Sequence, residues 1–284
     1  MTARTEGIPG VLLPDGRSVP ALGMGTWKMG EEAGQAEGEV AALRRGVELG
    51  MTLVDTAEMY ADGGAERIVA RALSGCRNDV FIVSKVYPHN AGARVAVAAC
   101  ERSLRRLETE AIDLYLLHWR GSVPLAETVA AFEHLRAQGK IVRWGVSNFD
   151  VPDMEELLTL QDGRHCAVNQ VLYNLSERGI EWRLLAMCRE HSIPVMAYSP
   201  LAQGPLLAQR GLRAVASALA ATPAQVALAW VLAQRGVIAI PQSSSVEHVE
   251  ENRAAAGLSL DAEAMRMLDA AFPPPRHATP LAML

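Results

Sequence analysis

Eight short apolar runs recur along the chain, and they constrain its fold more than any other feature. They begin near residues 21, 52, 81, 112, 141, 168, 193 and 237, and most lie about 25–30 residues apart. The runs lack the polar alternation of half-exposed strands, which indicates a parallel sheet covered on both faces. A segment with helical spacing follows each run. Eight such units favour a (β/α)8 barrel, or TIM barrel, over an open doubly wound sheet.

The helices between these runs are predicted from apolar residues at helical spacing. They should cover residues 31–49, 64–73, 93–107, 124–138, 152–160, 180–191, 213–220, 222–234, 246–256 and 261–271. Gly50 and Gly139 stand where two of them should end. Thr222 and Pro223 are typical of an N-cap and a first helical residue. A loop is expected over residues 199–211.

A β-hairpin should precede the first of the eight runs. Residues 11–19 have the strand pattern, with a turn at Asp15-Gly16. We expect this hairpin to cap the bottom of the barrel. No linker or change of composition marks a domain boundary, so residues 1–284 are expected to form a single barrel domain.

Composition excludes several classes of function. Half of the 284 residues are apolar, 21% are charged and the net charge is −5, which fits a globular protein with a large core. No basic run suits a nucleic acid, and no apolar run of about 18 residues suits a membrane span. The four cysteines share no metal-binding spacing, so we expect free thiols and no metal. Residues 1–9 lack a signal-peptide segment, and we expect a cytoplasmic monomer.

Polar residues stand where the eight runs end, and in a barrel these carboxyl ends form the active site. They are Thr26-Trp27, Asp55, Tyr60, Lys85, His118-Trp119, Ser147-Asn148, Asn169-Gln170, Tyr198-Ser199 and Gln242 to Ser245. Taken alone, Tyr60 is typical of a rim aromatic and His118 of a hydrogen-bonded structural histidine. Neither indicates catalysis by itself.

Four of these residues together make a coherent acid site. Lys85 directly follows a buried run, where an unpaired ammonium is unfavourable, and Asp55 at a neighbouring strand end is its natural partner. Tyr60, with an ordinary pKa of about 10, is a usable proton donor, and a nearby ammonium should favour its phenolate form. His118, as a neutral imidazole, could donate to a carbonyl oxygen. Such a site needs no metal.

These residues resemble the aldo-keto reductase superfamily over nearly the whole chain. The matching motifs, in family order, are Gly23-Met24-Gly25-Thr26-Trp27, Val54-Asp55-Thr56-Ala57-Glu58-Met59-Tyr60, Ser84-Lys85-Val86, Leu116-Leu117-His118-Trp119, Gly145-Val146-Ser147-Asn148-Phe149, Asn169-Gln170, Ala197-Tyr198-Ser199-Pro200-Leu201 and Ile240-Pro241. Each motif is weak alone, and their common order makes the signal specific. The likeness is greatest to small bacterial members that reduce methylglyoxal and related short aldehydes.

The resemblance implies a nicotinamide cofactor as hydride donor. It implies that Tyr60 is the general acid, that Lys85 and Asp55 tune it, and that His118 orients the carbonyl. The residues implied at the reacting end of the cofactor are Gly25, Thr26, Asp55, Ser147, Asn148, Gln170 and Tyr198, the last stacking on the nicotinamide ring. The implied substrate pocket is formed by Trp27, Tyr60, Tyr87, His118 and Trp119.

The sequence has no Rossmann fingerprint to bind the phosphates of the cofactor, because Gly23-Met24-Gly25 lacks the third glycine. The resemblance implies that Ser199, Pro200, Leu201 and Gln203 hold the pyrophosphate. It implies that the adenosine end meets Pro241, Gln242, Ser243, Ser244, Ser245, His248, Glu251 and Asn252. NADPH-preferring members usually carry cations where Gln242 and His248 stand. Charge-assisted hydrogen bonds to the 2′-phosphate of NADPH are about twice as strong as neutral ones, so the loss of these cations should weaken discrimination in favour of NADPH. We still expect NADPH as the cofactor, with NADH possible.

The activity implied is NAD(P)H-dependent reduction of aldehydes and activated ketones, such as methylglyoxal and aromatic aldehydes. Only residues 120–123 separate Trp119 from Pro124, and nine residues follow Pro275, so the pocket should be open. Arg120 is either a solvated rim residue or a cation that attracts carboxylate substrates. The main alternative is a regulatory or redox-sensing barrel that binds cofactor with little turnover. A barrel hydrolase or isomerase would need a second free carboxylate or a metal.

Overall fold

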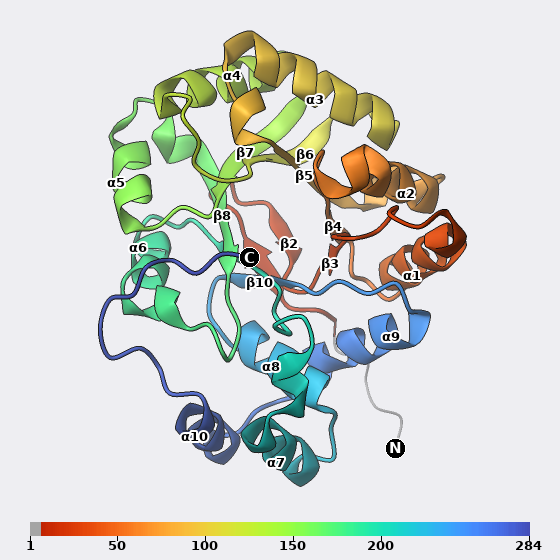
Figure 1. Ribbon diagram of the computed structural model, residues 1–284, viewed down its shortest axis with the longest axis vertical. Coiled ribbons are helices and arrows are strands. Elements are labelled where there is room, and N and C mark those ends of the chain that lie inside the picture. Colours follow the sequence, from red (N-terminus) through yellow and green to blue (C-terminus); the bar gives the residue numbers. More distant parts are fainter. Residues whose placement is uncertain (1–6) are drawn as a thin grey trace.

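Eight parallel strands form a nearly closed barrel in the structure, which is a computed structural model describing residues 7–284 (Figure 1). The strands are β3 (Met24–Gly25), β4 (Leu53–Asp55), β5 (Phe81–Val86), β6 (Ile112–Leu117), β7 (Ile141–Ser147), β8 (Cys166–Leu172), β9 (Val195–Tyr198) and β10 (Val237–Ile240). They neighbour one another in chain order, and bridges from Leu22 to Ala239 and from Gly25 to Gln242 bring the first and last together. The predicted (β/α)8 barrel is confirmed. Residues 1–6, most of the stretch expected to lack a signal peptide, lie outside the described residues.

Ten α-helices of the described chain surround the barrel (Figure 1). They are α1 (Ala36–Glu48), α2 (Gly64–Leu73), α3 (Ala93–Leu107), α4 (Leu125–Ala137), α5 (Val151–Thr159), α6 (Leu184–Glu190), α7 (Arg210–Ala218), α8 (Pro223–Leu232), α9 (Val246–Ala254) and α10 (Ala262–Ala271). The bounds of α2 and α3 are those predicted. Thr222 caps α8 by accepting a hydrogen bond from the Gln225 backbone, and the Gln225 side chain bonds back to the Thr222 N–H.

Several predicted boundaries were wrong. The helix expected over residues 31–49 begins only at Ala36, after a 3₁₀ turn that contains the poor helix former Gly34. The helix expected over 180–191 is interrupted at Arg183, whose φ of −145° is not helical. The expected loop 199–211 contains a 3₁₀ turn at Pro205–Ala208, and α7 starts within it.

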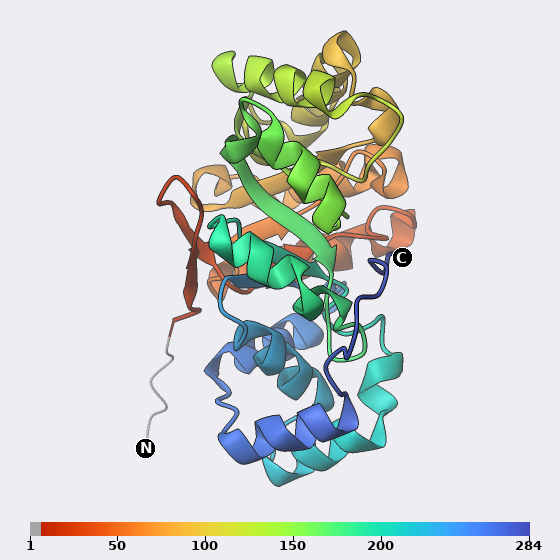
Figure 2. The same cartoon turned by 90° about the vertical axis from the view of Figure 1, so that its left-hand side faces the viewer.

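The hairpin of β1 (Gly10–Leu12) and β2 (Ser18–Pro20) closes the bottom of the barrel, as predicted. Its apolar side chains Val11, Leu13 and Val19 are buried in the same cluster as the residues that fill the barrel interior. In Figure 2 the hairpin lies at one end of the barrel, and the final residues of the chain lie at the opposite end, the mouth. A second, larger cluster fills the space between the strands and the helices. The strands are therefore packed on both faces, and the two clusters hold the strand ends at the mouth in fixed positions.

No single helix within residues 7–284 is long and apolar enough to cross a membrane. Only α7 and α8 together reach that length and composition, and they meet at a 90° bend. The four cysteines are all free thiols.

Candidate active site

Strand alternation aims the expected site residues into the barrel mouth. Every second residue of a strand faces the same side, so a residue two positions beyond an interior side chain also points inward. The pairs of interior and mouth residues are Leu53 and Asp55, Val83 and Lys85, Leu116 and His118, Val168 and Gln170, and Met196 and Tyr198. The mouth therefore collects side chains that are far apart in the sequence.

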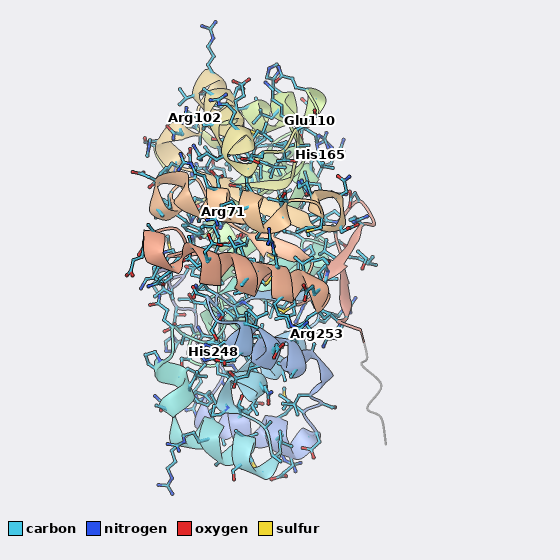
Figure 3. All side chains as sticks on the ribbon, turned by 90° about the vertical axis from the view of Figure 1, so that its right-hand side faces the viewer. Arg71, Arg102, Glu110, His165, His248 and Arg253 are labelled. Carbon is cyan, nitrogen blue, oxygen red and sulfur yellow. The ribbon has the colours of Figure 1, made fainter. Side chains whose placement is uncertain are left out.

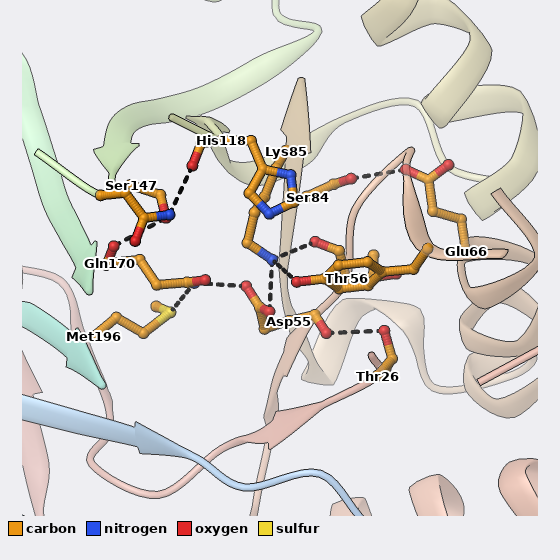
Figure 4. Close-up of polar contacts among 12 residues, drawn as sticks. Thr26, Asp55, Thr56, Glu66, Ser84, Lys85, His118, Ser147, Gln170 and Met196 are labelled. Carbon is orange, nitrogen blue, oxygen red and sulfur yellow. Dashed lines mark hydrogen bonds and ion pairs between the residues drawn. The ribbon is translucent and has the colours of Figure 1, made fainter. Parts of the chain in front are cut away.

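The Lys85 ammonium is the centre of the site (Figure 4). Its Nζ donates to Asp55 Oδ2 at 2.7 Å, to the Thr56 carbonyl at 2.9 Å and to the Tyr60 hydroxyl oxygen at 3.0 Å. The Lys85 side chain is 0% exposed and that of Asp55 3%. The structure thus joins the carboxylate and ammonium that the sequence predicted as partners. All three ammonium protons have acceptors, which a buried charge requires.

Tyr60 is positioned by an unusual turn. Four residues separate it from the end of β4, and the next two residues after it, Ala61 and Asp62, have left-handed φ values of +49° and +52°. Gly63 continues the turn at +78° and is the N-cap of α2. The Lys85 ammonium lies 4.7 Å from the Tyr60 ring centroid. Non-glycine residues adopt such conformations rarely, and at a site they indicate a position held by its surroundings.

The environment shifts the pKa values of this group in distinct directions. Burial opposes the charge on Lys85, but Asp55 and Tyr60 outweigh it and raise the pKa of the ammonium. Burial raises the pKa of Tyr60, and the opposing effect of Lys85 is smaller. Lys85 thus favours the phenolate as expected, but burial outweighs it, and the net effect is a raised pKa of Tyr60. In this structure the phenol is held protonated.

His118 lies beside Tyr60, with ring centroids 5.8 Å apart in an edge-on arrangement. Burial and then the Lys85 charge hold its pKa well below the usual value. The lowered pKa agrees with the neutral imidazole that was expected from the sequence. Its Nδ1 is buried and has no hydrogen-bond partner within residues 7–284. That atom is therefore available to a ligand.

The groups expected around the nicotinamide form a connected network. Gln170 Nε2 donates to Asp55 Oδ1 at 2.8 Å, and the Ser147 hydroxyl donates to the Gln170 carbonyl at 2.9 Å. The Tyr198 hydroxyl donates to Asn148 Oδ1 at 3.0 Å. Asn148 adopts a φ of +58°, and its amide nitrogen donates to the His118 carbonyl. The expected carboxamide ligands are thus gathered beside the Asp55–Lys85 pair.

Gly25 and Thr26 lie where the barrel closes. The Gly25 N–H donates to the Pro241 carbonyl, and a Cβ at Gly25 would lie 3.0 Å from the Ile240 carbonyl oxygen. The Thr26 hydroxyl donates to the Asp55 carbonyl at 3.0 Å. These two residues therefore brace β4 at the level of the site.

The loop expected at the pyrophosphate has a strained backbone. Ser199, Ala202 and Gln203 have φ values of +46°, +48° and +55°, and Gly204 has +108°. The Ser199 carbonyl accepts a hydrogen bond from Asn174. Pro200 and Leu201 complete the loop, which follows β9 at the mouth. Backbone strain of this kind gathers at ligand-binding loops.

The segment expected at the adenosine end is much more exposed. Gln242 and His248 are exposed, and the Gln242 amide donates to the Ser244 hydroxyl. Ser243 and Ser245 bond to each other, and Ser245 also caps α9. Glu251 is half-buried and Asn252 is buried, both on α9.

Arg253 cannot replace the missing cations. It bonds to the Leu49 carbonyl, and Figure 3 places it nearer the hairpin end than His248, which lies nearer the mouth. Arg253 therefore faces away from the expected adenosine site.

Aromatic rings line one side of the mouth. Tyr87 packs edge-on against Trp119, with centroids 6.0 Å apart, and stacks on His89 at 4.8 Å. Trp119 also contacts His118 at 4.8 Å. Trp27 is 38% exposed and carries Lys28 over its ring. We call Tyr87 and Trp119 the aromatic wall.

Arg120 forms an ion pair with a neighbouring helix. Its guanidinium makes two bonds with the Glu156 carboxylate on α5, at 2.8 and 2.9 Å. Its Nη1 is buried and has no hydrogen-bond partner within residues 7–284, so both interpretations of Arg120 stay predictions.

Glu58 and Glu66 are buried carboxylates that the sequence analysis missed. Glu58 accepts hydrogen bonds from the Tyr87 N–H and the Asn90 side chain, and Glu66 accepts one from the Ser84 hydroxyl (Figure 4). Both are charged residues in segments expected to pack inward, and this position is the only feature of the sequence that could have indicated their burial. These partners come from β5 and from the loop that follows it, which spacing does not reveal.

The part of the chain that is described holds no group of three His, Cys, Asp or Glu side chains able to bind a metal.

A cavity of about 500 Å³ lies beside the mouth, between the start of α5 and the C-terminal segment. Asp55, Lys85 and Tyr60 do not line it.

Comparison with known proteins agrees with this geometry. A family model described as "Aldo/keto reductase family" matches residues 21–272. Methylglyoxal reductase YeaE of Escherichia coli is 56% identical over 272 residues, covering 94% of this chain and 96% of that protein. Glyoxal reductase of Bacillus subtilis is 35% identical, with 92% and 91% covered. A crystal structure of an aldo/keto reductase from Klebsiella pneumoniae in complex with NADP and acetate superposes with a TM-score of 0.95, at 52% identity, covering 97% of this chain and 99% of that one.

Proposed function

The chain belongs to the aldo/keto reductase family, and from that membership together with the buried site we propose that it reduces aldehydes and activated ketones to alcohols, with NADPH as the hydride donor. The observation that carries the proposal is the Lys85 ammonium, which bonds at once to Asp55 and to the Tyr60 hydroxyl. A carbonyl that accepts hydride becomes an alkoxide and needs a proton at the same moment. A buried phenol beside a fixed cation is suited to supply it.

Tyr60 is the proton donor in this proposal. Its raised pKa keeps the hydroxyl protonated at neutral pH, so that the proton is present when the substrate binds. As the proton passes to the substrate oxygen, the Lys85 ammonium stabilises the developing phenolate at 3.0 Å. Asp55 holds that ammonium in place and charged. His118 donates a hydrogen bond to the carbonyl oxygen and fixes its position.

The residues at the mouth fit a nicotinamide cofactor. The half-buried Tyr198 ring lies beside the amides of Asn148 and Gln170, which can pair with a carboxamide. The strained loop after β9 suits a pyrophosphate, and the serine hydroxyls before α9 suit a phosphate at a helix N-terminus. When bound, reduced nicotinamide supplies the hydride to the carbonyl carbon. NADPH is proposed first because the similar Klebsiella structure holds NADP, and NADH is a possible substitute because Gln242 and His248 are not permanent cations.

The proposed substrates are small. The names of the similar proteins from Escherichia coli and Bacillus subtilis, a methylglyoxal reductase and a glyoxal reductase, support short dicarbonyls. The short loop of residues 120–123 forms no long wall on its side of the mouth, which would also admit aromatic aldehydes.

The direct test is the loss of absorbance of reduced cofactor when methylglyoxal or 4-nitrobenzaldehyde is added to the purified protein. We expect turnover with both aldehydes and a higher kcat/KM with NADPH than with NADH. Tight NADPH binding without turnover on a broad aldehyde panel would contradict the proposal and favour a regulatory barrel.

A further inference from the structure

Glu58 is a buried carboxylate that the proposed chemistry does not use. It lies between Asp55 and Tyr60, and its side chain is 6% exposed. Its Oε1 accepts hydrogen bonds from the Tyr87 backbone N–H at 2.9 Å and from Asn90 Nδ2 at 3.0 Å. Placing a carboxylate in the interior is unfavourable unless its bonds are worth more than its lost hydration.

The bonds of Glu58 join two neighbouring loops at the mouth of the barrel. One loop follows β4 and carries Tyr60, and the other follows β5 and carries Tyr87. The Glu58 N–H also donates to the Lys85 carbonyl at 3.3 Å. Glu58 is therefore fixed to the loop of the proposed acid through its backbone and to the aromatic wall through its side chain.

The position of Tyr87 determines that of the rest of the wall. Tyr87 packs edge-on against Trp119, and a Cβ at Gly121 would lie 2.5 Å from Pro88 Cβ, so the loops after β5 and β6 are in close contact. If the Tyr87 N–H lost its acceptor, a polar group at the edge of the interior would be left unpaired, and the loop would move to find water. Trp119 would then lose its packing partner.

We propose that Glu58 is a specificity-determining positioning residue, which sets the distance between the aromatic wall and Tyr60. This inference rests on the proposed carbonyl reductase function. Methylglyoxal is small enough to be held by Tyr60 and His118 alone, whereas the ring of an aromatic aldehyde must contact the wall. Glu58 thereby governs binding of large aldehydes and leaves reduction of small ones almost unchanged.

The Arg102 guanidinium is a lesser partner. It lies 3.7 Å from Glu58 Oε2, and its side chain is 41% exposed. A charge pair at this distance, with one partner exposed to solvent, contributes little. The hydrogen bond to the Tyr87 N–H, and not the charge pair, is the feature that carries the positioning.

The test compares Glu58→Ala, Glu58→Gln and the control Glu110→Ala, an exposed carboxylate on the outer surface (Figure 3). For Glu58→Ala we expect the KM for 4-nitrobenzaldehyde to rise about tenfold, since one lost hydrogen bond with displacement amounts to roughly that factor. The kcat and KM for methylglyoxal should stay within about threefold of the wild type, well below that factor. Glu58→Gln keeps an acceptor oxygen and should restore most of the affinity. The control variant Glu110→Ala should leave the kcat and KM for both aldehydes unchanged.

A double-mutant cycle with Tyr87→Ala checks the route of the effect. If Glu58 acts through Tyr87, Glu58→Ala in that background should add no further change in the ratio of the two KM values. Equal losses for both aldehydes, or an unchanged KM for 4-nitrobenzaldehyde in Glu58→Ala, would overturn the inference.

Quenching of tryptophan fluorescence by 4-nitrobenzaldehyde gives the same comparison without turnover. The Kd should rise about tenfold in Glu58→Ala and return towards the wild-type value in Glu58→Gln. An unchanged Kd would refute the role of Glu58 even if the wild-type protein reduced no aldehyde. Absence of wild-type turnover would refute only the proposed function.

Discussion

The two ends of the proposed cofactor site differ in how completely the fold holds their side chains. At the reacting end, Asp55, Lys85 and Tyr60 are bonded to one another in the interior. At the far end, residues 242–245 lie at the surface and bond mainly among themselves. The first set is preorganised and can stabilise charge without rearranging. The second leaves its groups free for a ligand, so we expect the barrel to determine the chemistry and a few exposed side chains to determine the choice of cofactor.

The comparison predicts the largest effect at the centre of the buried set. Lys85→Met removes the charge and keeps a side chain of similar length, so the kcat for methylglyoxal should fall about 10³-fold, within the range for loss of acid catalysis. The Kd for NADPH should change little, because Lys85 is aimed at Asp55 and Tyr60. A variant that retains a tenth of the kcat would show that the ammonium does not act in the proton step.

Removal of the carboxylate should mainly affect stability. Asp55→Asn leaves the ammonium of a fully buried Lys85 without a counter-charge, which should lower the free energy of unfolding by about 3 kcal/mol. Adding Lys85→Met to that variant should recover at least half of the loss, since the unpaired charge is then gone. Urea denaturation of the four proteins measures this, and additive losses would mean that the two residues are not coupled.

The pH profile should reflect the two shifted groups. Burial and Lys85 depress the pKa of His118, so the imidazole is already neutral at its ordinary pKa of 6.5 and above. Burial raises the pKa of Tyr60 above 10, so the phenol is still protonated at pH 9. The rate of hydride transfer in a single turnover should therefore vary by less than about threefold between pH 6.5 and pH 9. An inflection in that interval would mean that one of the groups titrates near its ordinary value.

The smallest effect is expected at the exposed end. Gln242→Arg adds a cation close to the proposed 2′-phosphate and should lower the KM for NADPH by about fivefold, the scale of an exposed ion pair. The KM for NADH should not change, because NADH lacks that phosphate. Equal shifts for both cofactors would mean that this loop does not contact the phosphate.

The sequence was sufficient for the barrel because each strand is an apolar run bounded by helix signals. It also predicted which residues meet at the mouth, since strand alternation carries Asp55, Lys85 and His118 inward. It could not predict the net direction of the Tyr60 pKa shift, which depends on how far burial outweighs one ammonium. The partners of Glu58 and Glu66 were also hidden, because they lie on β5 and in the loop after it, far from both residues in the sequence. The break of the sixth helix at Arg183 has no turn residue to signal it.

The central claim is that Tyr60 delivers the proton. Tyr60→Phe removes one oxygen and keeps the ring beside His118 and over Lys85. The rate of hydride transfer from NADPH to methylglyoxal in a single turnover should fall about 10³-fold or more, while the Kd for NADPH stays within about twofold. A variant that transfers hydride at more than a tenth of the wild-type rate would contradict the account.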